Sequence, residues 1–264
     1  MFCIKKEYFS RVQKLIAFTL AEVIIVVGII GIIAQLTIPS LVANYQRKVF
    51  ALGLKKAYIG LQSFFKGYLA EQGVTSLGDT ELYDGVTLFT DLNRQALWDQ
   101  AIKKHFRVVK SCDTTDSSCS YHQKYLTRTV ALGQFGANRY VFHTIDGIAY
   151  SITAPPTCKP DYSKPGLLKG LCGNVQIDVN GPKGPNIWGR DIHILFYINY
   201  DGTLIPISGY DVAIYSAGEN WSTSEAYWRN KSNLCGTLGS TDMPENTYGQ
   251  CIPRIMEEGW EMNY

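Results

Sequence analysis

The sequence predicts an α+β fold in which one long N-terminal helix packs on an antiparallel sheet. The first observation is an apolar run over 18–42, followed by a segment of helical periodicity over 44–72. The second is a pair of alternating segments, 139–153 and 192–208, each interrupted by Asp-Gly, which is a strong hairpin signal. The third is that six of the seven cysteines follow the apolar run. These features predict a membrane anchor carrying a disulfide-bonded soluble domain.

The apolar run is 25 residues long, and a helix of about 20 such residues crosses a bilayer. It contains a single ionisable residue, Glu22. A charged side chain inside a bilayer costs about 2.5–3.5 kcal/mol on insertion scales, so we expect Glu22 to have a function. Pro39 removes one backbone hydrogen bond, which predicts a kink at that point.

The basic excess of the chain lies ahead of the apolar run. The first 17 residues contain one acid, Glu7, and four basic residues: Lys5, Lys6, Arg11 and Lys14. They carry a net charge of +3 and the whole chain carries +2, so the remainder carries −1. This asymmetry indicates a basic leader on the cytoplasmic side of the membrane, and no nucleic-acid partner is expected.

The cysteines after the apolar run number six, which allows three disulfides in 15 possible pairings. They are Cys112, Cys119, Cys158, Cys172, Cys235 and Cys251. None belongs to a C-x-x-C pair, so disulfides are favoured over free thiols or metal ligands. The polar loop between Cys112 and Cys119 is expected to be closed by a bridge. Disulfides in turn predict a periplasmic or extracellular location.

The segment 44–72 is amphipathic and is predicted to pack on the sheet as core, with Gly73 ending the helix. Its apolar positions are Leu52, Leu54, Tyr58, Leu61, Phe64, Phe65, Tyr68 and Leu69. A second helix is predicted over Thr90–Lys104, with Thr90 or Asp91 as its cap.

The two hairpins, with a further strand over 175–179, predict a sheet of four or five strands. His143 and His193 fall within these strands, where a histidine satisfied by the sheet is the usual case. The chain has no G-x-S-x-G, H-E-x-x-H or phosphate-loop motif, so no enzymatic activity is expected.

Two interpretations are open for the loop that follows the strand at 175–179. Asp178, Asn180 and Asp191 offer oxygen ligands, which suits a calcium site. The spacing is not that of an EF-hand, and Asp, Asn, Gly and Pro are also the usual residues of turns. Calcium is the one cofactor that the sequence suggests.

The residues from Ala17 to Glu22 read Ala-Phe-Thr-Leu-Ala-Glu and precede a long apolar run. This pattern resembles the class III signal of type IV pilins and type II secretion pseudopilins: a small residue, then Phe-Thr-Leu-x-Glu, then the apolar run. The resemblance covers about residues 14–72 and says little about 73–264. One position departs from the family pattern, since Ala17 stands where the family nearly always has Gly.

The resemblance implies that a prepilin peptidase cuts between Ala17 and Phe18 and that the new amino group of Phe18 is N-methylated. Glu22 becomes the fifth residue of the mature chain and is expected to meet the amine of a neighbouring subunit. Pro39 becomes the twenty-second, where the family usually has a proline. The pair Cys235 and Cys251 resembles the C-terminal disulfide loop of many pilins.

The resemblance also implies a pilin-like organisation. The expected parts are a leader over 1–17, a transmembrane or filament-core helix over 18–43, its amphipathic continuation over 44–72, and a soluble domain over 73–264. The expected partners are other copies of the chain, other pilin-like subunits, prepilin peptidase and an inner-membrane assembly platform. The implied function is that of a structural filament subunit. The alternative is a membrane-anchored extracytoplasmic binding domain that does not polymerise.

Overall fold

The computed structural model describes residues 19–83, 85, 91–124, 131–162, 170–206 and 251–262. The chain divides into two compact units, Met1–Tyr45 and Gln46–Tyr264. Ala17, Phe18 and Cys235 lie outside the described residues, so the expectations placed on them stay predictions.

Helix α1 spans Leu20–Gln72 and supplies the described part of the first unit. None of the residues 19–49 is buried. Its most apolar window has a mean hydropathy of 2.4, which by length and composition suffices to cross a membrane. The predicted apolar run is therefore a continuous helix with its apolar side chains exposed, and it is long and apolar enough for a membrane span.

The helix continues through Pro39. The neighbouring hydroxyl groups are satisfied within the helix: Thr37 donates to the carbonyl of Ile33 at 2.9 Å, and Ser40 donates to that of Thr37 at 2.9 Å. In a bilayer such local bonds remove the need for a polar partner elsewhere.

The second half of α1 has one buried face, as predicted from its periodicity. The buried residues are Phe50, Ala51, Leu54, Ala57, Leu61, Phe64, Phe65, Tyr68 and Leu69. Leu52 was expected in this stripe, and that expectation is wrong, because its side chain is 63% exposed. Leu52 and Leu54 are two positions apart and so point to different faces of a helix. Gly73, at φ 67°, follows the last helical residue as expected.

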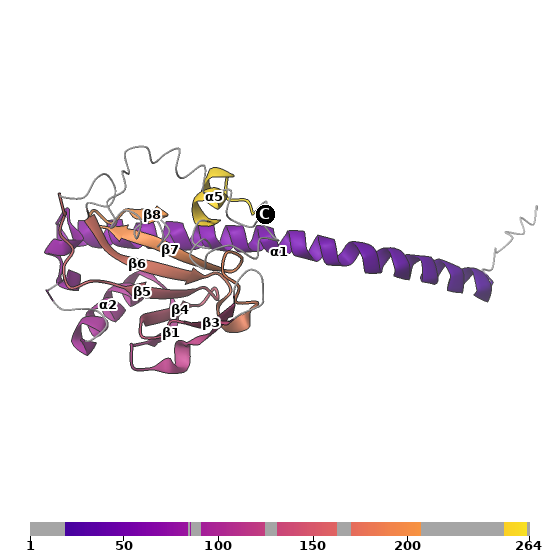
Figure 1. Cartoon of the computed structure of the whole chain (residues 1–264), viewed down its shortest axis with the longest axis horizontal. Helices are drawn as coiled ribbons and strands as arrows, with labels where there is room; N and C mark the ends of the chain where they lie inside the picture. The colour runs from indigo at the N-terminus through magenta and orange to yellow at the C-terminus, as the bar shows by residue number, and fades with distance from the viewer. Residues whose placement is uncertain are drawn as a thin grey trace, which may run out of the picture. The chain divides into compact units, whose positions relative to one another are not determined.

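The central sheet has six antiparallel strands in the order β1-β4-β5-β6-β7-β8 (Figure 1). They are β1 (Val108–Cys112), β4 (Tyr140–Thr144), β5 (Ala149–Thr153), β6 (Leu171–Asp178), β7 (Ile192–Asn199) and β8 (Leu204–Pro206). Both predicted hairpins are confirmed, β4–β5 around Gly147 at φ 87° and β7–β8 around Gly202 at φ 77°. The count of four or five strands was too low, because the edge strand β1 was not predicted.

A second, two-stranded sheet, formed by β2 (Tyr121–Lys124) and β3 (Ala131–Phe135), was not predicted either. The rings of Tyr121 and Phe135 stack across it, with centroids 5.0 Å apart. Phe135 packs with Val141 and Ala149, which alternate with the residues of β4 and β5 that contact the helices. The small sheet therefore covers the face of the large sheet opposite to α1.

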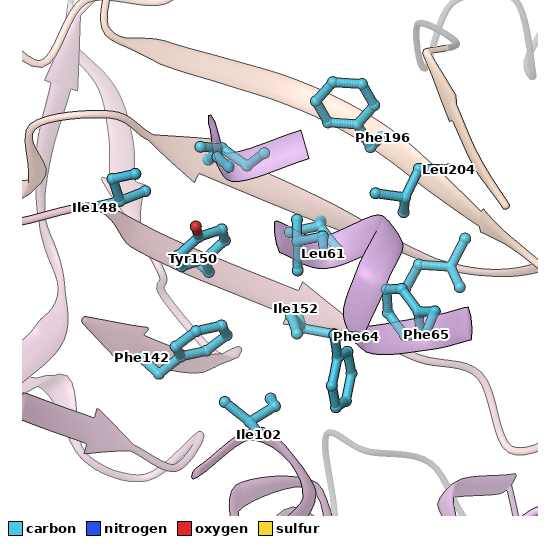
Figure 2. Packing of buried hydrophobic residues seen from close by; sticks show 14 of the residues in the cluster. Leu61, Phe64, Phe65, Ile102, Phe142, Ile148, Tyr150, Ile152, Phe196 and Leu204 are labelled. Atoms are coloured by element: carbon cyan, nitrogen blue, oxygen red, sulfur yellow. The ribbon is translucent and has the colours of Figure 1, made fainter. Parts of the chain in front are cut away.

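The main core lies between the large sheet and the helices (Figure 2). Leu61 and Phe64 of α1 lie beside Phe142 of β4 and Tyr150 of β5, while Ile102 of α2 closes one side. The other helical elements among the described residues are α2 (Leu92–His105), α5 (Cys251–Glu257) and the short turns η1 (Leu77–Asp79), η2 (Glu81–Tyr83), η3 (Ser117–Cys119) and η5 (Gly181–Lys183).

Asp91 caps α2 as predicted, accepting hydrogen bonds from the amides of Asn93 at 2.8 Å and Arg94 at 3.3 Å. Two disulfides join pairs of described residues, Cys112–Cys119 and Cys158–Cys172. Cys251 is disulfide-bonded as well. The first bridge closes the polar loop for which it was predicted.

Candidate functional site

The start of α1 is organised by a reciprocal pair of side chains, Thr19 and Glu22. The Thr19 backbone N–H and hydroxyl both donate to Oε2 of Glu22 at 2.8 Å. In return, the Glu22 backbone N–H donates to the Thr19 hydroxyl at 3.2 Å. This is a capping box, in which the residue before the helix and the third helical residue satisfy two otherwise free amides. Thr19 was not among the residues predicted to have a function, although its T-x-x-E spacing to Glu22 is visible in the sequence.

The capping box occupies one oxygen of the Glu22 carboxylate. Both side-chain bonds end on Oε2, and Oε1 has no hydrogen-bond partner among the described residues. The residue is exposed and surrounded along α1 by exposed apolar side chains such as Leu20 and Val23. One carboxylate oxygen is therefore held in place while the other stays available to a second donor.

Helix α1 contains no basic residue close enough to pair with Glu22. The nearest basic residues in the sequence are Lys14 before it and Arg47 after it, 25 positions along the chain. At about 1.5 Å per residue, Arg47 lies about 37 Å further along the helix. No cation within α1 therefore reaches the carboxylate.

The loop between β6 and β7 places the three predicted calcium ligands close to one another. Asp178 accepts hydrogen bonds from the Tyr121 hydroxyl at 2.7 Å and the Asn180 amide at 3.1 Å. Asp191 accepts from the amides of Asn186 and Ile187, each at 2.6 Å. Both carboxylates are fully buried. Each carboxylate is thus already satisfied by N–H or O–H donors of the protein.

Burial governs the protonation of this pair. It raises the pKa of Asp178 to about 8, an effect reinforced by the charge of Asp191 and opposed by the Tyr121 hydroxyl. Burial likewise raises the pKa of Asp191, against the Ile187 and Asn186 amides that favour its ionised form. Calcium takes ionised oxygen donors, so calcium binding here has to displace the proton of Asp178 and weakens as pH falls.

The oxygen donors left over in this loop are two amide carbonyls. Oδ1 of Asn180 and Oδ1 of Asn186 are buried and lack a partner among the described residues, while the Asn180 amide nitrogen donates to the carbonyl of Gly184 at 2.5 Å. Calcium takes six to eight oxygens, so the hydrogen-bonded arrangement fits a turn better than an ion site. Within the described ranges, no group of three His, Cys, Asp or Glu side chains forms a metal site.

The strand histidines lie apart from one another. His193 is buried on β7, and burial lowers its pKa to about 4. Burial also lowers the pKa of His143 on β4, with a contribution from Lys110. Asp146, near His143 in the sequence, instead pairs with Lys56 at 2.6 Å and accepts a hydrogen bond from Thr144. The structure therefore uses Asp146 to hold the β4–β5 turn against α1.

Comparison with protein-family models, curated proteins and solved structures finds no match for this chain.

Proposed function

We propose that the chain is a structural subunit of a type IV pilus-like or type II secretion pseudopilus-like filament. Prepilin peptidase cuts it between Ala17 and Phe18, and it assembles through α1. The observation that carries the proposal is Glu22, a lone carboxylate on an exposed apolar helix, with one oxygen held by Thr19 and the other open.

The energetics of Glu22 support an intermolecular partner. In a bilayer the ionised group is costly, and the two bonds from Thr19 offset only part of that cost. Cleavage before Phe18 creates an ammonium group four residues before Glu22 in the sequence, which is about one helical turn. When a neighbouring copy brings its ammonium group to Oε1, both charges are neutralised, and this pairing sets the register between subunits.

The location that we propose is the inner membrane, with a single span and the soluble unit on the periplasmic or extracellular side. The disulfides Cys112–Cys119 and Cys158–Cys172 support an oxidising compartment for that unit. The partners are other copies, other pilin-like subunits, prepilin peptidase and an inner-membrane assembly platform.

Cleavage separates this proposal from a membrane-anchored binding domain that does not polymerise. We expect the intact mass of membrane-extracted protein to lack residues 1–17 and to include one added methyl group on Phe18. Retention of Met1–Ala17 in cells that process other substrates of the peptidase would contradict the proposal. Ala17→Gly is the matched variant, since it restores the usual small residue and is expected to be cut at least as fast.

Calcium binding at Asp178, Asn180 and Asp191 stays a prediction, and the geometry favours the turn. We expect millimolar calcium to leave the melting temperature of the soluble unit unchanged at pH 6, where Asp178 retains its proton. A calcium-dependent rise that Asp191→Asn abolishes would instead establish the ion site.

A further inference from the structure

A groove in the soluble unit lies between α1, the end of α2 and the β4–β5 turn. Its volume is about 590 Å³, within the range of ligand-binding clefts. Phe64, Phe106 and Tyr150 line it, and Ile59 and Ile145 stand at its edges with 52% and 62% of their surfaces exposed. The groove is therefore apolar inside, with two exposed aliphatic side chains facing solvent.

The charge at the groove is positive. Arg107 lines it and is exposed, and its guanidinium has no partner among the residues that the structure describes. Lys56 lies on the opposite wall and pairs with Asp146 at 2.6 Å. His105 also lines the groove, and its Nε2 lies 3.4 Å from Oε1 of Glu71. Asp146 is thus the one acid of the lining beside the cations Lys56 and Arg107, and it pairs with Lys56. Arg107 is therefore available to an incoming carboxylate.

The disulfide loop Cys112–Cys119 is a preorganised acidic counterpart. Asp113 accepts from the amides of Thr115 at 2.8 Å and Asp116 at 3.0 Å, and Asp116 accepts from the Ser118 amide at 2.8 Å. Neither carboxylate forms an ion pair within the described ranges, although Lys110 lies near enough to donate to the carbonyl of Ser118 at 2.8 Å. The residues 115–118 are exposed, so the carboxylate of Asp116 is presented to solvent.

Strand β1 lies between the groove and the acidic loop and sets the distance between them. Arg107 immediately precedes β1, and the acidic loop begins at Cys112, where β1 ends. Five residues of strand span about 17 Å, so the two charges lie at opposite ends of one rigid edge strand. The loop of one molecule consequently does not reach its own groove.

We propose that the acidic disulfide loop of one copy docks in the groove of the next, pairing Asp116 with Arg107. This inference rests on the proposed filament function, which brings many copies into contact. A contact between two different surfaces of the same chain is heterologous, and its repetition generates an open helical array when the rotation between copies does not close a ring. The two patches of opposite charge, at the two ends of β1, suit that geometry.

Addition of a strand from another copy to the backbone of β1 is less favourable than a contact between side chains. The strand has five residues, carries Lys110, and its register with β4 shifts between Val108 and Lys110. Short length, an exposed lysine and a bulge are the features that discourage strand addition. The side chains at its two ends remain as the contact surfaces.

A zero-length cross-link tests the contact directly. Arg107→Lys places an amine at the groove, and carbodiimide joins an amine to a carboxylate that it touches. We expect full-length protein in membranes and filaments to give a dimer whose peptides join position 107 to Asp116. The dimer should fall at least threefold when Asp116→Asn is added. Cross-linked filaments that lack this peptide pair would overturn the inference.

Charge exchange provides the second test. We expect Arg107→Glu or Asp116→Lys alone to lower filament yield roughly three- to tenfold, and the double variant to restore most of it. Lys183→Glu is the matched control, because Lys183 is exposed and lies in neither surface. If the wild-type protein forms filaments and neither single variant lowers the filament yield, the docking is refuted and the filament function is retained. A cross-link between position 107 and Asp116 in the Arg107→Lys protein, without filaments, would support the contact and refute the filament function.

Discussion

The two halves of α1 belong to one uninterrupted helix but differ in where their partners lie. From Thr19 to Val49 no residue is buried, whereas nine residues between Phe50 and Leu69 are buried. Leu61, Phe64 and Phe65 of this second half lie in the core shown in Figure 2. The second half finds its apolar partners in the sheet of the same chain. The first half presents the same kind of side chains without a protein partner among the described residues, and the proposed function assigns lipid and other copies of the chain as its partners.

The charged residues show the same difference. In the second half, Lys56 pairs with Asp146 at 2.6 Å, and Lys66 donates to the carbonyl of Asp201 at 2.6 Å. In the first half, Glu22 bonds only to Thr19 within its own first turn. The second half of the helix is thus bonded to the soluble domain, whereas the carboxylate of Glu22 keeps one oxygen without a partner among the described residues.

The largest expected effect comes from the buried face. Phe65→Ala leaves a cavity beside Phe64 and Trp98, and we expect it to lower the free energy of unfolding of the soluble unit by about 3–5 kcal/mol. Leu52→Ala, on the exposed side of the same helix, should change it by less than about 0.5 kcal/mol. Denaturant titration followed by tryptophan fluorescence measures both. Equal losses would remove the distinction between the two faces.

The next effect comes from the disulfide that closes the core near the start of β6. Replacing Cys158 and Cys172 together with Ser should cost roughly 2–4 kcal/mol, because the bridge spans 14 positions. The same change at Cys112 and Cys119 should cost less, since that bridge spans 7 positions. Thermal unfolding of the two double variants gives the comparison, and the reverse order would contradict it.

A smaller effect is expected from pH. The pKa of Asp178 is raised to about 8 by burial in the folded state, against about 3.9 unfolded, so the folded state retains a proton that the unfolded state has lost. The contribution of Asp178 to the free energy of unfolding is therefore fully present at low pH and is lost as the pH rises toward 8. His193 acts in the opposite direction but only below about pH 6.5, because burial lowers its pKa to about 4.

Between pH 6.5 and 8 we therefore expect the free energy of unfolding to fall by about 1–2 kcal/mol. Asp178→Asn should remove most of that fall. Asp116→Asn is the control, since Asp116 is exposed and hydrogen bonds from Ser118 keep its pKa below the usual range. A stability that is flat across this range in the unmodified protein would show that Asp178 does not hold a proton.

The smallest effect on stability is expected at the free end of α1. Thr19→Val removes the hydroxyl of the capping box, and losing such a cap costs about 0.5–2 kcal/mol of local helix stability. Hydrogen exchange in detergent should accelerate at the amides of residues 20–23 and remain unchanged in residues 50–69. Acceleration across the whole helix would show that the two halves are not independent.

The sequence predicted the parts of the fold that depend on local signals. The Asp-Gly turns predicted both hairpins, Asp91 predicted the start of α2, and the 3.6-residue period predicted the buried face of α1. The edge strand β1 and the pair β2–β3 were not predictable in the same way. Their residues neither alternate cleanly nor meet at a short turn, and the contacts that stabilise them, such as Tyr121 with Asp178, join distant segments.

The candidate sites divide along the same line. Glu22 was found because a lone acid in an apolar run is unusual at any position in a span. The protonation states of Asp178 and Asp191 were not predictable from the sequence, because they depend on burial and on hydrogen-bond donors from β2 and from the loop before β7. The groove at Arg107 was not predictable from the sequence either, because its walls come from three elements that are separated in the chain.

The central claim is that the exposed half of α1 assembles subunits through the carboxylate of Glu22. The most direct measurement is filament formation by Glu22→Val, compared with Thr19→Val, which keeps the carboxylate, and with Glu71→Val on the folded half of the same helix. We expect Glu22→Val to be inserted and cleaved but absent from filaments, while the other two variants assemble. Filaments of Glu22→Val at the wild-type level would contradict the claim, and equal loss in Thr19→Val would reduce Glu22 to a helix cap.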